Sequence, residues 1–98
     1  MRVYWSARAK ARLRRIAEHI REQRPMAVEP TITRIVERSW RLQELPRIGR
    51  AVPEYAQPDL REVLERPYRI IYRVGAERID VITVMHYREL LPDDLDSL

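Results

Sequence analysis

The chain has 98 residues, of which 45% are hydrophobic and 35% are charged, and its formal net charge is +4. This length fits a single domain over residues 1–98, and the absence of cysteine excludes a disulfide framework and a thiolate metal site. The N-terminus lacks the apolar run of a signal peptide and no segment reaches the length of a membrane span. We therefore expect a soluble, cytoplasmic protein that does not contact a membrane.

A first helix is predicted after a short β-prone segment at residues 3–5. Ser6 can cap this helix, apolar residues recur in it at helical spacing, and Pro25 stops it. Its other face is charged, and we expect solvent to cover that face. The charged residues are Arg8, Arg12, Arg15, Glu18 and Glu22.

A second helix is predicted to begin near Glu29 and to end at Pro46, because Pro30 is tolerated only in a first turn. Together the two helices form a helical hairpin. Trp5 and Trp40 are expected in the core, with cover by a partner segment as the alternative for Trp40. The buried stripe of the second helix consists of Val28, Ile32, Ile35, Val36, Ser39 and Leu42, with Trp40 near its edge.

The second half of the chain changes to a period of two, which is typical of strands. Residues 46–59 form a loop that contains three prolines. Turns at Pro67 and Gly75 indicate an antiparallel meander. Residues 93–98 are expected to be a loose acidic tail. The strands are predicted at residues 60–65, 68–74 and 78–87.

The predicted fold class is α+β, with the order β-α-α-β-β-β and the helical hairpin packed on one face of a small antiparallel sheet. In the stretch 68–74, "YRIIYRV", successive side chains alternate between the two faces. Tyr68 and Tyr72 are expected in the core under the helices, whereas Arg69 and Arg73 line an open face. Alternatively, these arginines pair across the sheet with acidic residues. The candidates for such pairs are Glu62 and Asp80.

Basic residues are concentrated in the first half of the chain. Residues 1–50 hold 13 basic and 5 acidic side chains, whereas residues 51–98 hold 6 basic and 10 acidic ones. Nearly all the basic residues are arginine, which pairs bidentately with carboxylates and phosphates. This pattern indicates either nucleic acid or an acidic protein segment as a partner, although a GC-rich genome explains the arginine preference equally well.

Four stretches together resemble the RelE/ParE superfamily of toxins from bacterial type II toxin–antitoxin systems. They are "VYWSARAKARLRRIAEHI", "LQELPRIGRAVPE", "LREVLERPYRIIYRV" and "IDVITVMHYRELLP", and the resemblance covers about residues 2–92. The superfamily fold that this resemblance implies is the arrangement derived above. RelE-like members cleave mRNA on the ribosome, whereas ParE-like members inhibit DNA gyrase and are not nucleases.

A RelE-like nuclease needs a base, an acid and positive charge beside the scissile phosphate. Arg73, His86 and Tyr87 are the candidates, with ribosome and mRNA as the partners. However, His86 and Tyr87 are adjacent and point to opposite faces of a regular strand, unless the strand ends or bulges there. The stretch 53–59, "PEYAQPD", is neutral to acidic, which weakens this alternative.

The pattern "RAVPE…LREV…PYRIIYRV" resembles the ParE-like branch more closely. The resemblance then implies a DNA gyrase inhibitor with a role in plasmid stabilisation, with no catalytic residue and no cofactor. It also implies a hetero-oligomer with an antitoxin, whose acidic amphipathic segment folds on the toxin. A metal site is not expected, because the two histidines lie in different elements. The predicted partner-binding residues are Arg61, Arg69, Arg73, His86 and Arg88.

Overall fold

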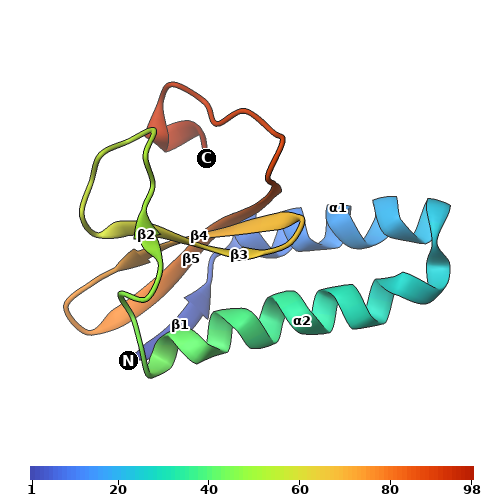
Figure 1. Ribbon diagram of the computed structural model, residues 1–98, viewed down its shortest axis with the longest axis horizontal. Helices are drawn as coiled ribbons and strands as arrows, with labels where there is room; N and C mark the ends of the chain where they lie inside the picture. The colour runs from blue at the N-terminus through green and yellow to red at the C-terminus, as the bar shows by residue number, and fades with distance from the viewer.

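A computed structural model describes all residues, 1–98, and consists of a five-stranded sheet with two helices packed against one face (Figure 1). The strands are β1 (Arg2–Trp5), β2 (Arg50–Ala51), β3 (Leu60–Glu65), β4 (Tyr68–Val74) and β5 (Arg78–His86). The α-helices are α1 (Ala7–Gln23) and α2 (Val28–Trp40). Short 3₁₀ helices are η1 (Pro25–Ala27), η2 (Arg41–Gln43) and η3 (Leu95–Ser97). The α+β architecture and the helical hairpin predicted from the sequence are confirmed.

The helix boundaries follow the local signals, with one difference at the end of α2. Ser6 caps α1, because its hydroxyl accepts a hydrogen bond from the Ala9 amide at 3.0 Å. Helix α2 ends at Trp40, well before Pro46, and the chain tightens into η2, which places Leu42 in the core. No helix of the molecule is both long enough and apolar enough to cross a membrane.

The sheet is mixed, whereas the sequence predicted an antiparallel one. Its strand order is β1-β5-β4-β3-β2, and β1 lies parallel to β5 with Trp5 opposite Val81. The remaining pairs are antiparallel. The helical hairpin follows β1 in the chain, so no tight turn connects β1 to a neighbouring strand. Strand β1 can therefore pair in parallel with β5. Strand β2 was not predicted, because a strand of two residues is too short to show a period of two.

The main core lies between the sheet and the helices, and it confirms the predicted placement of Tyr68 and Tyr72. Trp5 is half-buried, and its indole N–H donates to the Ser39 hydroxyl at 3.0 Å. Trp40 is 54% exposed, so its prediction as a core residue is wrong. It follows Ser39 by one residue, which turns it away from the buried stripe. The predicted stripe is buried at Ile35, Ser39 and Leu42 and half-buried at Val28, Ile32 and Val36, and Thr31 is buried in addition.

The second face of the sheet, which the sequence predicted to be open, is covered over most of its area, whereas Leu64 of β3 on this face is 45% exposed. Ile71 and Met85 project from this face into a smaller apolar cluster with Val52, Leu60 and Leu98. The C-terminal segment lies over it beside the loop that follows β2, and the Tyr55 hydroxyl donates to the Pro92 carbonyl at 2.5 Å (Figure 1). Residues 93–98 are therefore packed, in contrast to the expected loose tail. The leucines that pack in this segment are Leu91, Leu95 and Leu98.

Gly49 marks the entry to β2 and allows the chain to pass close to the sheet. Its amide donates to the Tyr72 hydroxyl at 3.0 Å, and a Cβ at this position would lie 2.6 Å from that oxygen and closer still to the Glu62 carbonyl. We expect Gly49→Ala to lower the free energy of unfolding by about 2 kcal/mol or more, because the backbone at Glu62 is fixed by pairing with β4. Urea unfolding measures this loss.

Gly75 provides the matched control for this substitution. It lies in the turn between β4 and β5, and an added Cβ would meet only the Arg78 carbonyl, at 3.0 Å. Gly75→Ala should therefore lower the free energy of unfolding by less than about 1 kcal/mol. Equal urea midpoints for Gly49→Ala and the parent chain would contradict the close approach.

Candidate interaction surface

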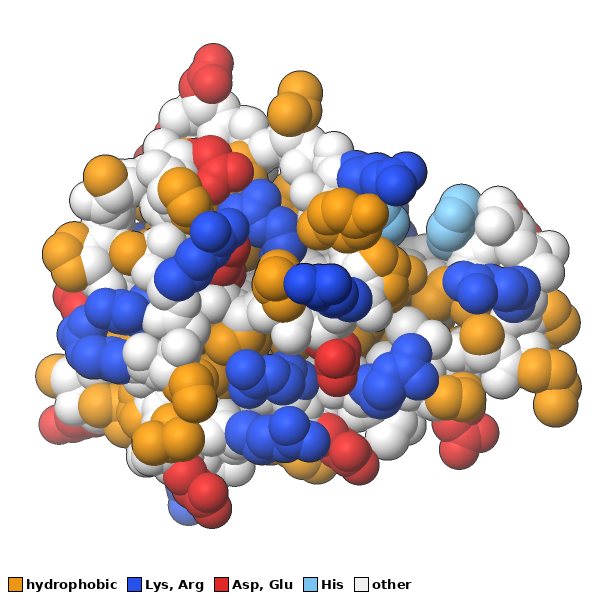
Figure 2. Space-filling view, in the orientation of Figure 1, with side chains coloured by type: hydrophobic (Ala, Val, Ile, Leu, Met, Phe, Trp, Pro, Cys, Tyr) orange, Lys and Arg blue, Asp and Glu red, His pale blue; other side chains and the backbone are white.

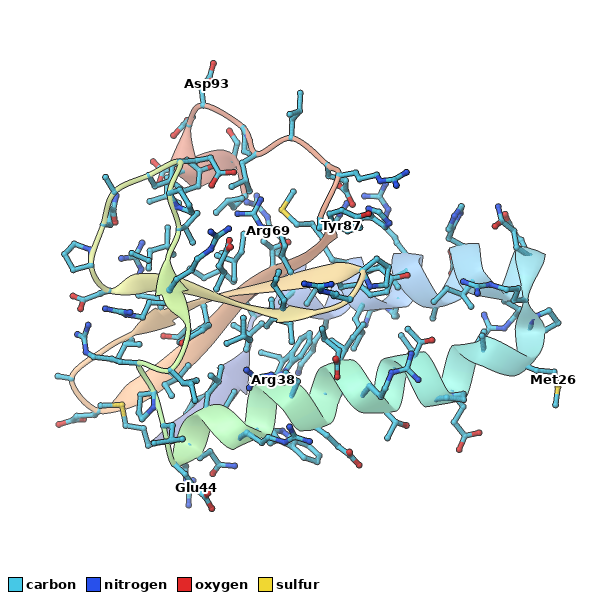
Figure 3. The ribbon with its side chains drawn as sticks, in the orientation of Figure 1. Met26, Arg38, Glu44, Arg69, Tyr87 and Asp93 are labelled. Carbon is cyan, nitrogen blue, oxygen red and sulfur yellow. The ribbon has the colours of Figure 1, made fainter.

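Arg69 lies in a buried ion-pair network on the second face of the sheet (Figure 3). Its side chain is 8% exposed, and its Nε donates to Glu62 Oε1 at 2.9 Å. Its two terminal nitrogens reach Glu54 at 3.2 and 3.3 Å. The side chain of Glu62 is 1% exposed and also accepts from Arg50 Nε at 2.8 Å. The pairing with Glu62 considered above is confirmed, and Arg69 does not lie on the open face that the sequence predicted for it.

The pKa values of this network follow from burial and hydrogen bonding. Burial alone would lower the pKa of Arg69, but the hydrogen bonds to Glu54 and Glu62 outweigh burial and raise it. The hydrogen bond from Arg69 holds the pKa of Glu54 below its ordinary value. Both groups are therefore charged at neutral pH, and Arg69 fastens the loop that carries Glu54 to the sheet.

Arg61 and Arg73 lie on opposite faces of the sheet, so they do not form one patch with Arg69. Arg61 is paired with Tyr72 in the register of β3 and β4, which places it on the helix side. There its Nη1 donates to the Gly49 carbonyl at 2.7 Å, and its Nε is buried without a hydrogen-bond partner. Arg73 is half-buried on the second face, with its Nη1 3.4 Å from Gln57 Oε1. The period of two in each strand accounts for this separation.

His86 begins a tight turn at the end of β5, and residues within this turn are hydrogen-bonded to one another. The His86 amide donates to Glu89 Oε1 at 3.0 Å, and the Arg88 amide donates to His86 Nδ1 at 3.1 Å. Arg12 of α1 donates to both carboxylate oxygens of Glu89 at 2.8 Å and to the Val84 carbonyl at 3.2 Å. These bonds fasten the turn to the first helix.

The pKa of Glu89 is determined by burial and by its hydrogen bonds in the turn. Burial would raise the pKa of Glu89, but hydrogen bonds from the His86 amide and from the Arg12 guanidinium outweigh burial and lower it. The carboxylate therefore stays ionised at neutral pH. The Arg12–Glu89 contact shows that this face of α1 accepts a carboxylate.

Tyr87 and Arg88 project from the turn into solvent, and with His86 they form what we call the aromatic tip. Tyr87 is 50% exposed and stacks on His86, with ring centroids 4.8 Å apart and an interplanar angle of 23°. The Arg88 guanidinium lies 5.5 Å from the Tyr87 ring centroid, and its Nε donates to the Tyr87 hydroxyl at 3.2 Å. Figure 3 shows Tyr87 just beyond the end of β5.

The nuclease candidates Arg73, His86 and Tyr87 are not assembled into one site. His86 pairs with Tyr68 at the start of β4, whereas Arg73 lies near the other end of that strand. Five residues of extended chain span about 17 Å, and the two side chains also project from opposite faces. His86 Nδ1 accepts a hydrogen bond from the Arg88 amide at 3.1 Å. The strand end does bring Tyr87 onto His86, and Arg88 lies beside Tyr87.

The charged face of α1, which we expected solvent to cover, lies next to the aromatic tip. Two hollows of about 330 and 350 Å³ open on either side of Glu89, and Arg12 and Arg15 line both of them. Arg8 lines the first hollow, whereas His19 and His86 line the second. The spacing of positions 8, 12, 15 and 19 is a sequence signal for one helix face, but charged helix faces are usually only solvated.

Comparison with known proteins agrees with this fold. The family model of the ParE toxin of type II toxin–antitoxin system, parDE, matches residues 3–91. Among solved structures, a chain described as "Chromosomal ParDE TA system from P. aeruginosa" is 27% identical with a TM-score of 0.75, and the match covers 88% of this chain and 95% of that chain. A search of curated proteins finds no significant match. Since the family model spans nearly the whole sequence, the chain belongs to the ParE toxin family of type II toxin–antitoxin systems.

Proposed function

We propose that this chain is a toxin that inhibits DNA gyrase by binding it, and that an antitoxin protein neutralises it. Membership of the ParE toxin family supports the toxin role. The observation that carries the choice between gyrase and ribosome is the separation of Arg73 from His86 at opposite ends of β4 and on opposite faces. An inhibitor that acts by occupying a partner's surface needs no assembled acid, base and phosphate-binding group.

The aromatic tip is the part of the surface best suited to hold the target. Tyrosine and arginine dominate the energetics of protein interfaces, because they combine large contact area with directed hydrogen bonds. Here the stack on His86 and the bonds within the turn fix Tyr87 before any partner arrives. A preorganised anchor loses little conformational entropy on binding. Of the predicted partner-binding residues, His86 and Arg88 keep this role in the proposal.

Supercoiling of relaxed plasmid by gyrase, run beside ribosome-dependent mRNA cleavage mapped by primer extension, tests the proposal. We expect the purified toxin to abolish supercoiling, to accumulate cleaved DNA and to leave mRNA intact. Tyr87→Ala should weaken gyrase inhibition by about tenfold or more, because it removes an interface anchor. Tyr87→Phe should weaken it less, since it keeps the stacked ring and loses only the bond from Arg88.

The nuclease alternative predicts the reverse order of effects. If Tyr87 supplies a proton from its hydroxyl, Tyr87→Phe is as damaging as Tyr87→Ala, and His86→Ala also abolishes activity. Cut mRNA with normal gyrase activity would overturn the proposed target and restore the RelE-like reading.

A further inference from the structure

The turn between β3 and β4 lies at the same end of the sheet as the aromatic tip. Tyr68, the first residue of β4, is opposite His86, the last residue of β5. The Tyr87 amide donates a hydrogen bond to the Pro67 carbonyl of the turn at 2.8 Å. The rings of Tyr68 and His86 also meet edge to face, with their centroids 5.9 Å apart. These contacts join the turn and the aromatic tip into one continuous surface.

A hollow of about 560 Å³ opens on this surface. We call it the turn hollow, and it is lined by Leu64, Arg66, Pro67, Tyr68 and Tyr87. Ligand pockets measure about 300–1,000 Å³, so the turn hollow can take a large apolar side chain. Figure 2 shows hydrophobic and basic side chains gathered here, around the position at which Figure 3 labels Tyr87.

No segment of the chain itself fills the turn hollow. The C-terminal segment packs on Ile71 and Met85, further along the second face of the sheet. Leu64 belongs to neither apolar cluster and is 45% exposed, and Tyr87 is 50% exposed. Exposed apolar side chains that lie together and are not covered mark an interaction site.

The rim of the turn hollow is basic. Arg66 lines the hollow, and Arg88 lies beside it on Tyr87. Both arginine side chains are exposed, and neither forms an ion pair. No acidic residue lines the hollow. The rim therefore attracts a partner that carries carboxylates.

Two glutamates follow or precede these arginines in the chain, and both are directed elsewhere. Glu65 is half-buried and projects toward the helix side of β3, whereas its neighbour Leu64 projects from the second face. The Glu89 carboxylate accepts hydrogen bonds from Arg12 and from the His86 amide. The two unpaired guanidinium groups therefore determine the charge of the rim.

We propose that the turn hollow is the part of the gyrase-binding surface that receives an apolar side chain of gyrase, and that acidic groups beside this side chain pair with Arg66 and Arg88. This inference rests on the proposed function, because it names gyrase as the occupant. It gives Leu64 and Arg66 a role in target binding, with Tyr87 as one wall of the pocket. A buried anchor in a pocket, surrounded by contacts that exclude water, dominates the energy of many protein interfaces.

Two other occupants fit the turn hollow less well. In a symmetric dimer the same patch of both chains meets, which would bring Arg66 and Arg88 close to the same arginines of the second copy. A nucleobase needs a free ring face on which to stack. His86 stacks on Tyr87, and the Arg88 guanidinium lies over the same ring, so little of its face is free.

Inhibition of gyrase supercoiling by full-length variants tests the proposal. We expect Leu64→Asp/Arg66→Glu to raise the toxin concentration that halves supercoiling by at least about tenfold, because a carboxylate enters an apolar pocket and the rim changes sign. Arg66→Glu alone changes only an exposed turn residue without an ion pair, so the fold is kept. It should raise that concentration by at least about threefold and weaken its dependence on salt.

The matched control makes the same changes of residue type at the other end of the molecule. Leu45→Asp/Arg41→Glu replaces an exposed leucine and an exposed arginine that lie outside the turn hollow. Figure 3 labels Glu44, the residue before Leu45, far from Tyr87. This control should inhibit gyrase as the parent chain does. Urea unfolding and calorimetric titration with the full-length antitoxin show that each variant is folded.

The outcomes separate this inference from the proposed function. If the parent chain inhibits gyrase and a folded Leu64→Asp/Arg66→Glu variant inhibits it equally, the turn hollow is not the site, and the proposed function stands. Normal gyrase activity with the parent chain overturns the gyrase target itself, and gyrase as the occupant with it. If the double variant keeps gyrase inhibition and loses antitoxin binding, the hollow holds antitoxin and the inference is wrong. Loss of affinity for a 30-base-pair DNA duplex in the double variant, without loss of binding to gyrase alone, makes the hollow a nucleic-acid contact and also overturns it.

Discussion

Replacing Arg69 with alanine is expected to lower the free energy of unfolding by about 3–5 kcal/mol. The substitution leaves the Glu62 carboxylate, whose side chain is 1% exposed, with only the solvent-exposed guanidinium of Arg50 beside it. It also frees Glu54, and with it the loop that follows β2. The free energy of unfolding of a native protein is about 5–15 kcal/mol in total, so this loss removes a large part of it. Urea unfolding followed by circular dichroism measures it.

Two further variants keep this prediction testable if Arg69→Ala does not fold. Arg50→Ala removes the exposed member of the network, whose side chain is 66% exposed, and should lower stability by about 1 kcal/mol or less. The double variant Arg69→Met/Glu62→Leu removes both buried charges and should recover most of the loss. If the double variant is no more stable than Arg69→Ala, the buried carboxylate is not the cause.

The elements that the sequence predicted well are those whose signals are local. Ser6 as a helix cap, Pro25 as a stop and the alternation in "YRIIYRV" each act within a few residues. The alternation correctly placed Tyr68 and Tyr72 under the helices. No contact from elsewhere in the chain was needed to derive these features.

The errors concern contacts between distant segments. Pairing of Arg69 with Glu62 was considered as an alternative, but its second partner was not found, because Glu54 belongs to a loop without periodicity, fifteen residues earlier in the chain. The second face of the sheet looked open because its cover, the C-terminal segment, is rich in aspartate and reads as a solvated tail. Which segment covers a face depends on the tertiary fold, and composition does not reveal it.

The candidate site was predicted in part, for a similar reason. His86 and Arg88 were singled out and do lie together at the end of β5, where residue chemistry and strand position are both visible in the sequence. Arg15 was assigned to a solvated face and His19 was not proposed as a binding residue, because a charged helix face gives no sign of the hollow beside it. Only the packing of α1 against β5 creates that hollow.

Removing residues 91–98 is expected to lower the free energy of unfolding by about 2–4 kcal/mol. The truncation takes away three leucines that pack on the second face, Leu91, Leu95 and Leu98, and exposes Ile71 and Met85 to water. The helix-side core is untouched, so we propose that the shortened chain still unfolds in one cooperative transition, as a single domain does. The urea midpoint and the slope of the transition report both effects.

The control keeps the leucines and removes the charge of the tail. Asp93→Asn/Asp94→Asn/Asp96→Asn leaves all apolar contacts in place, and its free energy of unfolding should stay within about 0.5 kcal/mol of the parent value. If the truncated chain unfolds at the parent midpoint, residues 93–98 are the loose tail that their composition suggested. A midpoint lowered only by the truncation instead shows that leucine packing, and no charge in the tail, holds this segment on the sheet.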